Sequence, residues 1–206
     1  MWPLNSPPIL PDEPGDFGTS RSTDVHTGVD LYCPLDSEVL AIEDGEIVGI
    51  EAFTGTWVPG EDASPWWNDT AAILVRSPSG IIVYGEVEPP PSPANLIGRK
   101  VTAGESIGRV RPVLRTFKGR PMVMLHLELL SGLPDGYGGL YLKEGDISAT
   151  CWWHLGDPKP DRLLDPRPLL EGAPRFDLAA YNGEDFVDPS APRKDSPYWK
   201  VWGGTP

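Results

Sequence analysis

The chain has 206 residues, of which 39% are hydrophobic, and this favours one domain with an ordinary buried core and room for an appendage. Its formal net charge of −13 argues against a nucleic-acid partner, because such binding depends on clustered Lys and Arg that neutralise phosphates. No run of about twenty apolar residues predicts a membrane span, and no heptad or internal repeat indicates a particular oligomeric state.

Residues 1–16 form a proline-rich lead-in, which lacks the basic patch and the apolar stretch of a secretory signal. We therefore expect synthesis in the cytoplasm without a signal peptide. Cys33 and Cys151 lie too far apart in sequence to suggest a disulfide framework, so we expect two free, largely buried thiols.

The 23 glycines and 25 prolines interrupt the chain so often that long helices are not expected. Short apolar or alternating runs bounded by turn residues predict strands instead. Six such runs are 39–42, 46–50, 72–76, 81–87, 106–110 and 123–129. The pair Asp44-Gly45 predicts a β-hairpin, and a second hairpin is expected at residues 77–80. The sequence thus predicts an all-β fold.

A long polar and aromatic insertion, FTGTWVPGEDASPWWNDT, separates two of these strands and is expected to form one wall of a groove. Within it, Trp66, Trp67 and Asn68 are candidate substrate-binding residues, because flat rings stack on sugar or peptide faces. Paired aromatic residues also serve simply to pin a long loop, and the sequence favours neither interpretation.

After Trp152 the chain is spaced by prolines, and Pro166 to Leu170 is expected to make a helical turn that closes the domain near Gly172. Residues 173–206 show neither helical nor strand periodicity and are interpreted as an irregular C-terminal extension.

Two of the three histidines occur in strings that resemble halves of one metal site: HTGVD, with His26 and Asp30, and MLHLEL, with His126. Two imidazoles and one carboxylate are a ligand set of catalytic zinc, which leaves a fourth position for water. His26 and Asp30 can converge either on one face of a strand or around a turn through Gly28. An isolated histidine is more often structural, but the two together favour a metal.

The run MVMLHLELL alternates, so Met122, Met124, His126 and Glu128 share one face and the leucines share the other. Because the leucines must face the core, His126 is expected to face a cleft. Glu128 is then either a partner that orients an imidazole or, more plainly, an exposed strand glutamate. His154 in CWWHLGDP is interpreted as a packed structural residue, with a swing into the groove as the alternative.

The order of the motifs resembles that of the lysostaphin-like (LytM-type) zinc metalloendopeptidases, which have the duplicated hybrid motif fold. HTGVDLYCPLDSEVLAIEDGEIVGIE resembles the opening pattern of that family, His-x-Gly-x-Asp followed by Val-x-Ala and Asp-Gly-x-Val. Later strings, in the same order as in the family, are IVYGEV, VTAGESIG, MLHLEL and LLDPRPLL. The resemblance covers roughly residues 17–170 and gives the expected domain limits of 17–172.

This resemblance implies a compact antiparallel β-sandwich with long loops and one zinc ion on the floor of a groove. It implies that His26, Asp30 and His126 are the zinc ligands. Two further family histidines, which move protons and stabilise the oxyanion, fall at Glu86 and Met124. Glutamate can accept a proton in their place, whereas methionine cannot.

Two other residues in the matching strings are candidates. Arg21 resembles an arginine that precedes the metal motif in the family, although a surface salt bridge explains it equally well. Tyr84, in IVYGEV, is a candidate substrate contact.

Two functions follow from the resemblance. In the first, the chain is a zinc-dependent endopeptidase that cuts peptidoglycan peptides, with Glu86 as the general base. Delivery to the cell wall or periplasm would then depend on a phage or on secretion machinery. In the second, the chain is an inactive zinc-binding relative that binds a peptide or cell-wall ligand or has a structural role.

Overall fold

The computed structural model describes residues 2–5, 15–114 and 123–171. The expected extension at 173–206 and the placement of Met122 lie outside these residues. Within them the regular structure is ten strands and three short 3-10 helices, with no α-helix. The prediction of an all-β fold is therefore confirmed.

The main sheet has eight strands, with the central order β1-β8-β5-β4-β3-β6, while β10 pairs with β8 and β9 with β3. The bounds are β1 (Val29–Tyr32), β3 (Gly45–Thr54), β4 (Thr70–Ser77), β5 (Gly80–Val87), β6 (Lys100–Val101), β8 (Met124–Leu130), β9 (Leu140–Tyr141) and β10 (Leu163–Leu164). A second sheet contains only β2 (Glu38–Leu40) and β7 (Ser106–Arg109). The 3-10 helices are η1 (Gly60–Asp62), η2 (Pro93–Leu96) and η3 (Arg167–Leu170).

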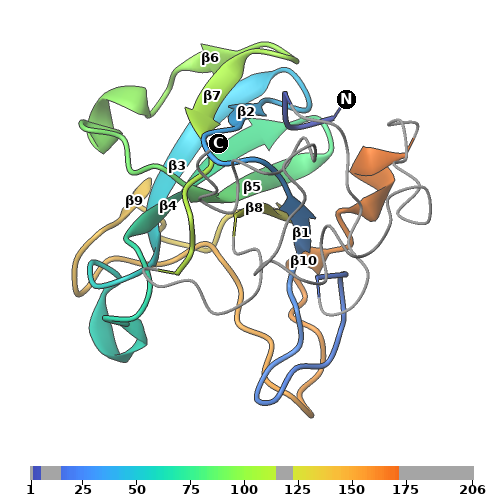
Figure 1. Ribbon diagram of the computed structural model, residues 1–206, viewed down its shortest axis with the longest axis vertical. Coiled ribbons are helices and arrows are strands. Elements are labelled where there is room, and N and C mark those ends of the chain that lie inside the picture. Colours follow the sequence, from blue (N-terminus) through green and yellow to red (C-terminus); the bar gives the residue numbers. More distant parts are fainter. Residues whose placement is uncertain (1, 6–14, 115–122, 172–206) are drawn as a thin grey trace, which may run out of the picture.

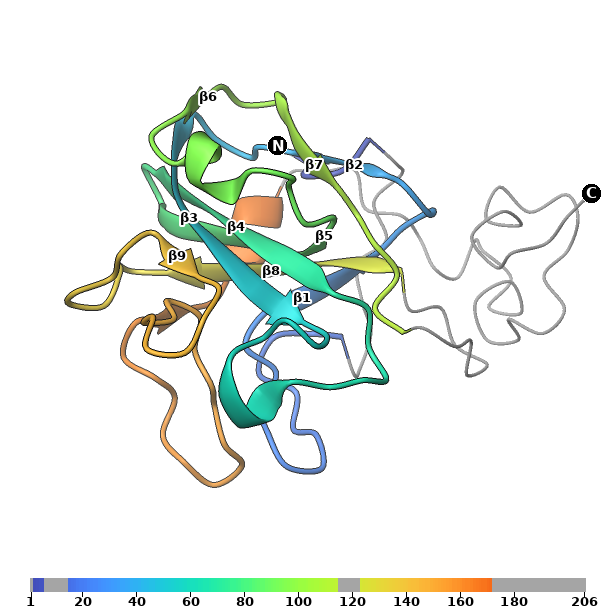
Figure 2. The ribbon, with the colours of Figure 1, turned by 90° about the vertical axis from the view of Figure 1, so that its left-hand side faces the viewer.

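The main sheet is covered on both faces. Figures 1 and 2 show β2 and β7 above it and long loops below it. The upper core holds the side chains of Val39, Ile47, Ile73, Tyr84 and Leu127, and a smaller cluster lies under the lower face. Because β4 and β5 are buried on both sides, their sequences are nearly continuous apolar runs rather than alternating ones.

The N-terminal lead-in contributes to the upper layer. Trp2 and Leu4 are buried in the upper core, and Leu4 forms a β-bridge with Val39 of β2. The side-chain oxygen of Asn5 accepts a hydrogen bond from the backbone N–H of Glu38. Residues 2–5 thus pack as part of the domain.

The sandwich differs from the expected one in two respects. All strand pairs are antiparallel except β3 and β9, which are parallel. The predicted hairpin at Asp44-Gly45 is wrong, because β2 pairs with β7 whereas β3 pairs with β4, β6 and β9. The chain passes there from one layer to the other.

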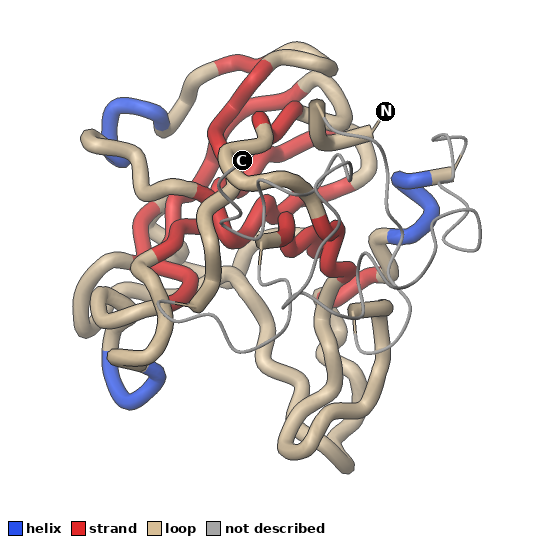
Figure 3. The backbone as a smooth tube through the Cα atoms, viewed as in Figure 1, coloured by secondary structure: helices blue, strands red, loops and turns tan. Residues whose placement is uncertain are grey.

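The remaining predictions about connections agree with the structure. Ser77 and Gly80 are register partners at the turn between β4 and β5, which confirms the second hairpin. The long insertion joins β3 to β4, and η3 forms a helical turn at the expected position. Figure 3 shows how much of the lower half consists of loops. Within the described residues, none of the helices has the length and apolar character to cross a membrane.

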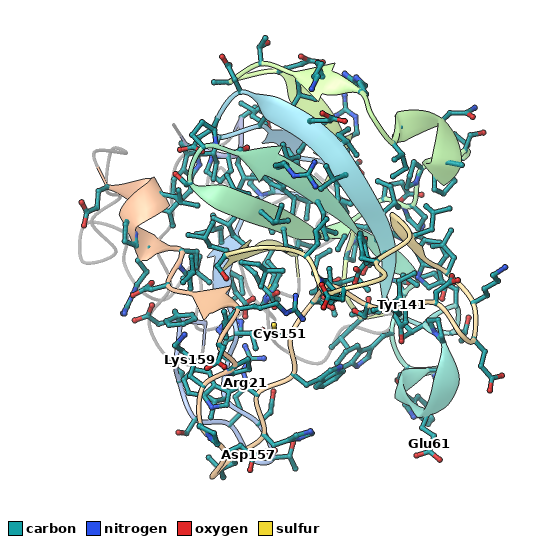
Figure 4. The ribbon with its side chains drawn as sticks, turned by 180° about the vertical axis from the view of Figure 1, so that it is seen from behind. Arg21, Glu61, Tyr141, Cys151, Asp157 and Lys159 are labelled. Carbon is teal, nitrogen blue, oxygen red and sulfur yellow. The ribbon has the colours of Figure 1, made fainter. Side chains whose placement is uncertain are left out.

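The two cysteines are free thiols, as expected. Cys33 is buried, and burial raises the pKa of its thiol to about 12. Cys151 is half-buried in the loops below the sheet (Figure 4).

Candidate metal centre and active site

Antiparallel pairing of β1 with β8 brings the two separated motifs together. Asp30 of β1 is the register partner of His126 of β8. Directly opposed residues in an antiparallel pair have their side chains on the same face. This face is the lower one, because Val29, Leu31, Leu125 and Leu127 fill the upper core.

His26 precedes β1 and turns its ring toward the same point. The distance from His26 Nε2 to His126 Nδ1 is 3.2 Å, and that from His26 Nε2 to Asp30 Oδ1 is also 3.2 Å. The third side of the triangle, from Asp30 Oδ1 to His126 Nδ1, measures 2.8 Å. His26 is 2% exposed, Asp30 is 7% exposed and His126 is 8% exposed. The centre is therefore more enclosed than the open groove expected from the sequence.

The outward-facing nitrogen of each ring has its own acceptor. His26 Nδ1 lies 3.0 Å from the backbone carbonyl oxygen of Asp16, and His126 Nε2 lies 3.0 Å from Glu128 Oε1. Both oxygens accept, so we assign the ring protons to these outer nitrogens. When the inner nitrogens, His26 Nε2 and His126 Nδ1, carry no proton, they direct lone pairs at the centre of the triangle, as metal ligation requires.

Glu128 is buried, not exposed as its strand position had suggested. Besides His126, its Oε1 accepts a hydrogen bond from the hydroxyl of Thr27. Glu128 therefore holds the His126 ring in place.

Arg21 reaches the centre from the loops below the sheet (Figure 4). Its guanidinium donates a hydrogen bond of 3.0 Å to Asp30 Oδ2, the oxygen that does not face the histidines. Arg21 thus holds the carboxylate of Asp30 so that Oδ1 faces the two rings. The ion pair between Arg21 and Asp30 therefore belongs to the centre and is not an isolated surface salt bridge.

Without a metal the centre holds a proton. Burial acts against a charged ring, but the hydrogen bonds to Asp30 and Glu128 outweigh it and raise the pKa of His126 to about 10. Burial would also raise the pKa of Asp30, but the hydrogen bonds of His126 and His26 hold it well below its usual range. A divalent cation would have to displace the proton on His126.

The residues fit a zinc ion. Tetrahedral coordination with bonds of about 2.0–2.1 Å places neighbouring ligand atoms about 3.3 Å apart. The three sides of 2.8–3.2 Å are close to this value. Two lone pairs and a carboxylate oxygen at these separations repel one another unless a cation or a proton lies between them. No other cluster of three potential ligands was found among the described residues.

Gly28 permits this convergence. A Cβ at this position would lie 2.4 Å from the backbone oxygen of Leu127 and 2.8 Å from His126 Nε2. The glycine between His26 and Asp30 therefore lets the motif pass close against β8.

We expect Gly28→Ala to lower the free energy of unfolding by about 1–3 kcal/mol and to weaken metal binding, because the backbone of β8 cannot give way. Urea denaturation and zinc titration measure the two effects. Gly132→Ala is the matched control, since a Cβ at Gly132 meets nothing within 4 Å. Equal stability and zinc affinity in the two variants would contradict this role.

Glu86 reaches the lower face through a β-bulge. The register of β4 and β5 shifts between Ala71 and Ile73, so Gly85 and Glu86 together stand opposite Ala72. Glu86 has a φ of 61°, which costs an L residue about 1 kcal/mol. Because of the bulge, Tyr84 and Val87 both point into the upper core while Glu86 does not.

The carboxylate of Glu86 is buried beside two threonines. Thr70 Oγ1 donates to Glu86 Oε2 at 2.9 Å, and Thr54 Oγ1 lies 3.3 Å from the same oxygen. Burial raises the pKa of Glu86 to about 7, although the hydrogen bond from Thr70 lowers it. Its neighbour Gly85 is the register partner of His126. A carboxylate with a pKa near neutrality is suited to general acid–base work.

The prediction that Tyr84 contacts a substrate is wrong, because the side chain of Tyr84 is fully buried. Its hydroxyl accepts a hydrogen bond of 2.9 Å from the backbone N–H of Ile42 in the upper core. His154 is neither packed nor part of the metal cluster: it is exposed, and its backbone forms a bridge with Asp24.

The candidate substrate residues in the long insertion differ from one another. Trp66 is 71% exposed and Trp67 is 43% exposed. The side-chain amide of Asn68 donates to the backbone oxygens of Pro112 and Leu114, so it anchors the loop. Outside the insertion, Met124, which the resemblance places at the position of a family histidine, is buried on β8.

Four partners of the site were missed by sequence reasoning. They are Thr27, Thr54, Thr70 and the carbonyl of Asp16. A backbone carbonyl leaves no signal in a sequence. Thr27 lies within the HTGVD string, and its polar side chain next to His26 was the only available hint.

Comparison with family models found no match, and comparison with curated proteins found none either. Among solved structures, the chain is similar to the solution structure of lysostaphin, with 19% identity and a TM-score of 0.41 over 74% of this chain. It spans about 45% of the lysostaphin chain.

The chain is also similar to the crystal structure of the catalytic domain, in a single-residue variant, of the prophage-encoded M23 protein EnpA from Enterococcus faecalis. That likeness has 21% identity and a TM-score of 0.42, and covers 64% of this chain and 87% of the other.

Proposed function

We propose that the chain is a zinc-dependent hydrolase that cuts peptide bonds in peptidoglycan. The observation that carries the proposal is the triangle of His26 Nε2, Asp30 Oδ1 and His126 Nδ1. Its dimensions match a tetrahedral zinc site, and three side chains leave a fourth position open, as in catalytic rather than structural sites.

Zinc, when bound, would supply Lewis-acid polarisation of the scissile carbonyl and lower the pKa of water. The outer partners Asp16, Glu128 and Arg21 keep the three ligands oriented. Glu86 accepts the proton of the attacking water and returns it to the leaving amine. With a pKa near 7, Glu86 gains and loses this proton at little cost in free energy.

The substrate class rests on the motif resemblance and on the character of the long insertion. Trp66 presents an exposed indole, which suits stacking against a sugar or peptide face. The loop that carries it is held by Asn68 and by Trp57, whose indole N–H donates to the backbone oxygen of Thr70. We propose the cell wall as the place of action.

Metal removal tests the proposal. We expect the purified chain to contain one zinc ion and to release soluble peptides from purified peptidoglycan. Treatment with a chelator should stop release, and added zinc should restore it, because the proposed reaction depends on the polarising charge of the metal. Peptide products are measured by mass spectrometry and zinc by elemental analysis. Bound zinc with intact muropeptides would contradict hydrolysis and favour an inactive zinc-binding relative that holds a wall peptide.

A further inference from the structure

We propose that Thr70 and Thr54 are positioning residues that hold Glu86 by Oε2 and leave Oε1 as the oxygen that exchanges the proton. This inference rests on the proposed role of Glu86 as the base. It concerns residues that the motif resemblance does not include.

Three strand ends meet at this network. Thr54 ends β3, Thr70 begins β4, and the two are register partners. The register of β3 and β4 shifts between Ala52 and Thr54, next to the shift in β4 and β5 that turns Glu86 downward. Bulges next to functional sites commonly redirect a side chain in this way. The two irregularities therefore bring the hydroxyls and the carboxylate to one point.

The two oxygens of Glu86 are not equivalent. Both side-chain hydrogen bonds to this carboxylate go to Oε2, and Oε1 accepts none from the described residues. Glu86 as a whole is 6% exposed. One oxygen is thus anchored by the threonines, and within the described residues the other carries no hydrogen bond.

The hydrogen-bond distances show which of the two threonine hydroxyls donates its proton to Glu86 Oε2. A hydroxyl donates only one hydrogen bond. Thr70 is nearer to Oε2, at 2.9 Å against 3.3 Å for Thr54. Thr54 has two better acceptors, Thr70 Oγ1 at 2.6 Å and the backbone oxygen of Asn68 at 3.0 Å. Thr70 is therefore the direct donor to Glu86, and Thr54 supports Thr70.

Among the described residues, two charged groups act on the Glu86 carboxylate. His126 on β8 and Asp30 on β1 act on it electrostatically, in opposite directions. Arg111 donates its backbone N–H to the Glu86 carbonyl, while its guanidinium pairs with Glu88. None of these groups changes when a threonine is replaced by valine, so a change at Glu86 reports on the lost hydroxyl.

The test measures the pKa of Glu86 in the zinc-free protein by carbon NMR of labelled glutamate, with Glu86→Gln to assign the signal. Thr70→Val removes a hydrogen bond to the charged form, so we expect an upward shift of about one to two pH units. Thr54→Val should shift it less, and Thr70→Ser should restore the original value. Thr102→Val is the matched control, because its hydroxyl also lies near a carboxylate, that of Glu105, on the surface.

The second readout is the pH profile of peptide release by the zinc-loaded protein. Its acidic limb should move upward in Thr70→Val by the same amount as the NMR value and return in Thr70→Ser. An unchanged Glu86 signal in Thr70→Val, or a serine variant that fails to restore it, would overturn the positioning role. Absence of peptide release by the wild type would overturn the proposed function alone, because the NMR result stands without it.

Discussion

Replacing His126 with alanine should give a protein that no longer binds zinc. The imidazole supplies one corner of the ligand triangle and contacts both Asp30 and Glu128. Its removal leaves two ligands, and it also leaves two buried carboxylates without a shared partner. Breaking a buried charge pair costs about 3–5 kcal/mol, so we expect the variant to be strongly destabilised as well. Elemental analysis and thermal unfolding measure the two effects.

Two substitutions separate loss of the metal site from loss of the fold. Asp30→Asn keeps the shape of the side chain and should lower zinc affinity by more than the roughly 10- to 100-fold that an outer partner contributes. Glu128→Gln keeps an acceptor for His126 and should fall within that smaller range. His154→Ala is the matched control, since His154 is exposed and outside the cluster. Zinc affinity equal to the wild type in Asp30→Asn would show that the triangle is not the metal site.

Short-range patterns predicted the face of His126 correctly. The alternation along MLHLEL places the leucines in the upper core and His126 with Glu128 on the lower face, as the structure does. The turn at residues 77–80 was also predicted, because both of its strands belong to one sheet. The same kind of signal failed at Asp44-Gly45. A tight turn has the same sequence signal whether the chain returns to the same sheet or crosses to another.

The bulge at Glu86 explains the error at Tyr84. Regular alternation along IVYGEV puts Tyr84 and Glu86 on one face, and both then become candidates for the same site. The extra residue opposite Ala72 separates them, so Tyr84 is buried in the upper core and Glu86 is not. Strands β6, β9 and β10 have two residues each and were not predicted. They are too short to show any periodicity in sequence. Their extended conformation depends on pairing with β3 or β8.

Glu86→Gln should abolish most peptide release while leaving zinc in place. Glutamine keeps the size of the side chain and a hydrogen-bonding oxygen for Thr70, but it cannot accept and return a proton. General acid–base catalysis typically contributes about 10²–10⁴-fold, and we expect the rate to fall by that factor. Release of peptides at the wild-type rate, measured at equal zinc content, would exclude Glu86 as the base.

The same variant has a second expected effect, on stability. Burial raises the pKa of Glu86 from 4.5 to about 7, so between these values the folded chain binds more protons than the unfolded chain. The stability of the wild type therefore falls as the pH rises from 4.5 to about 7, by about 3 kcal/mol from this group. Glutamine does not titrate, so in the zinc-free state Glu86→Gln should gain on the wild type by that amount between pH 4.5 and pH 8. Urea denaturation at the two pH values measures the gain. A stability difference that stays constant with pH would mean that folding does not raise the pKa of Glu86, and a carboxylate of ordinary pKa would be too weak a base for the proposed proton transfer.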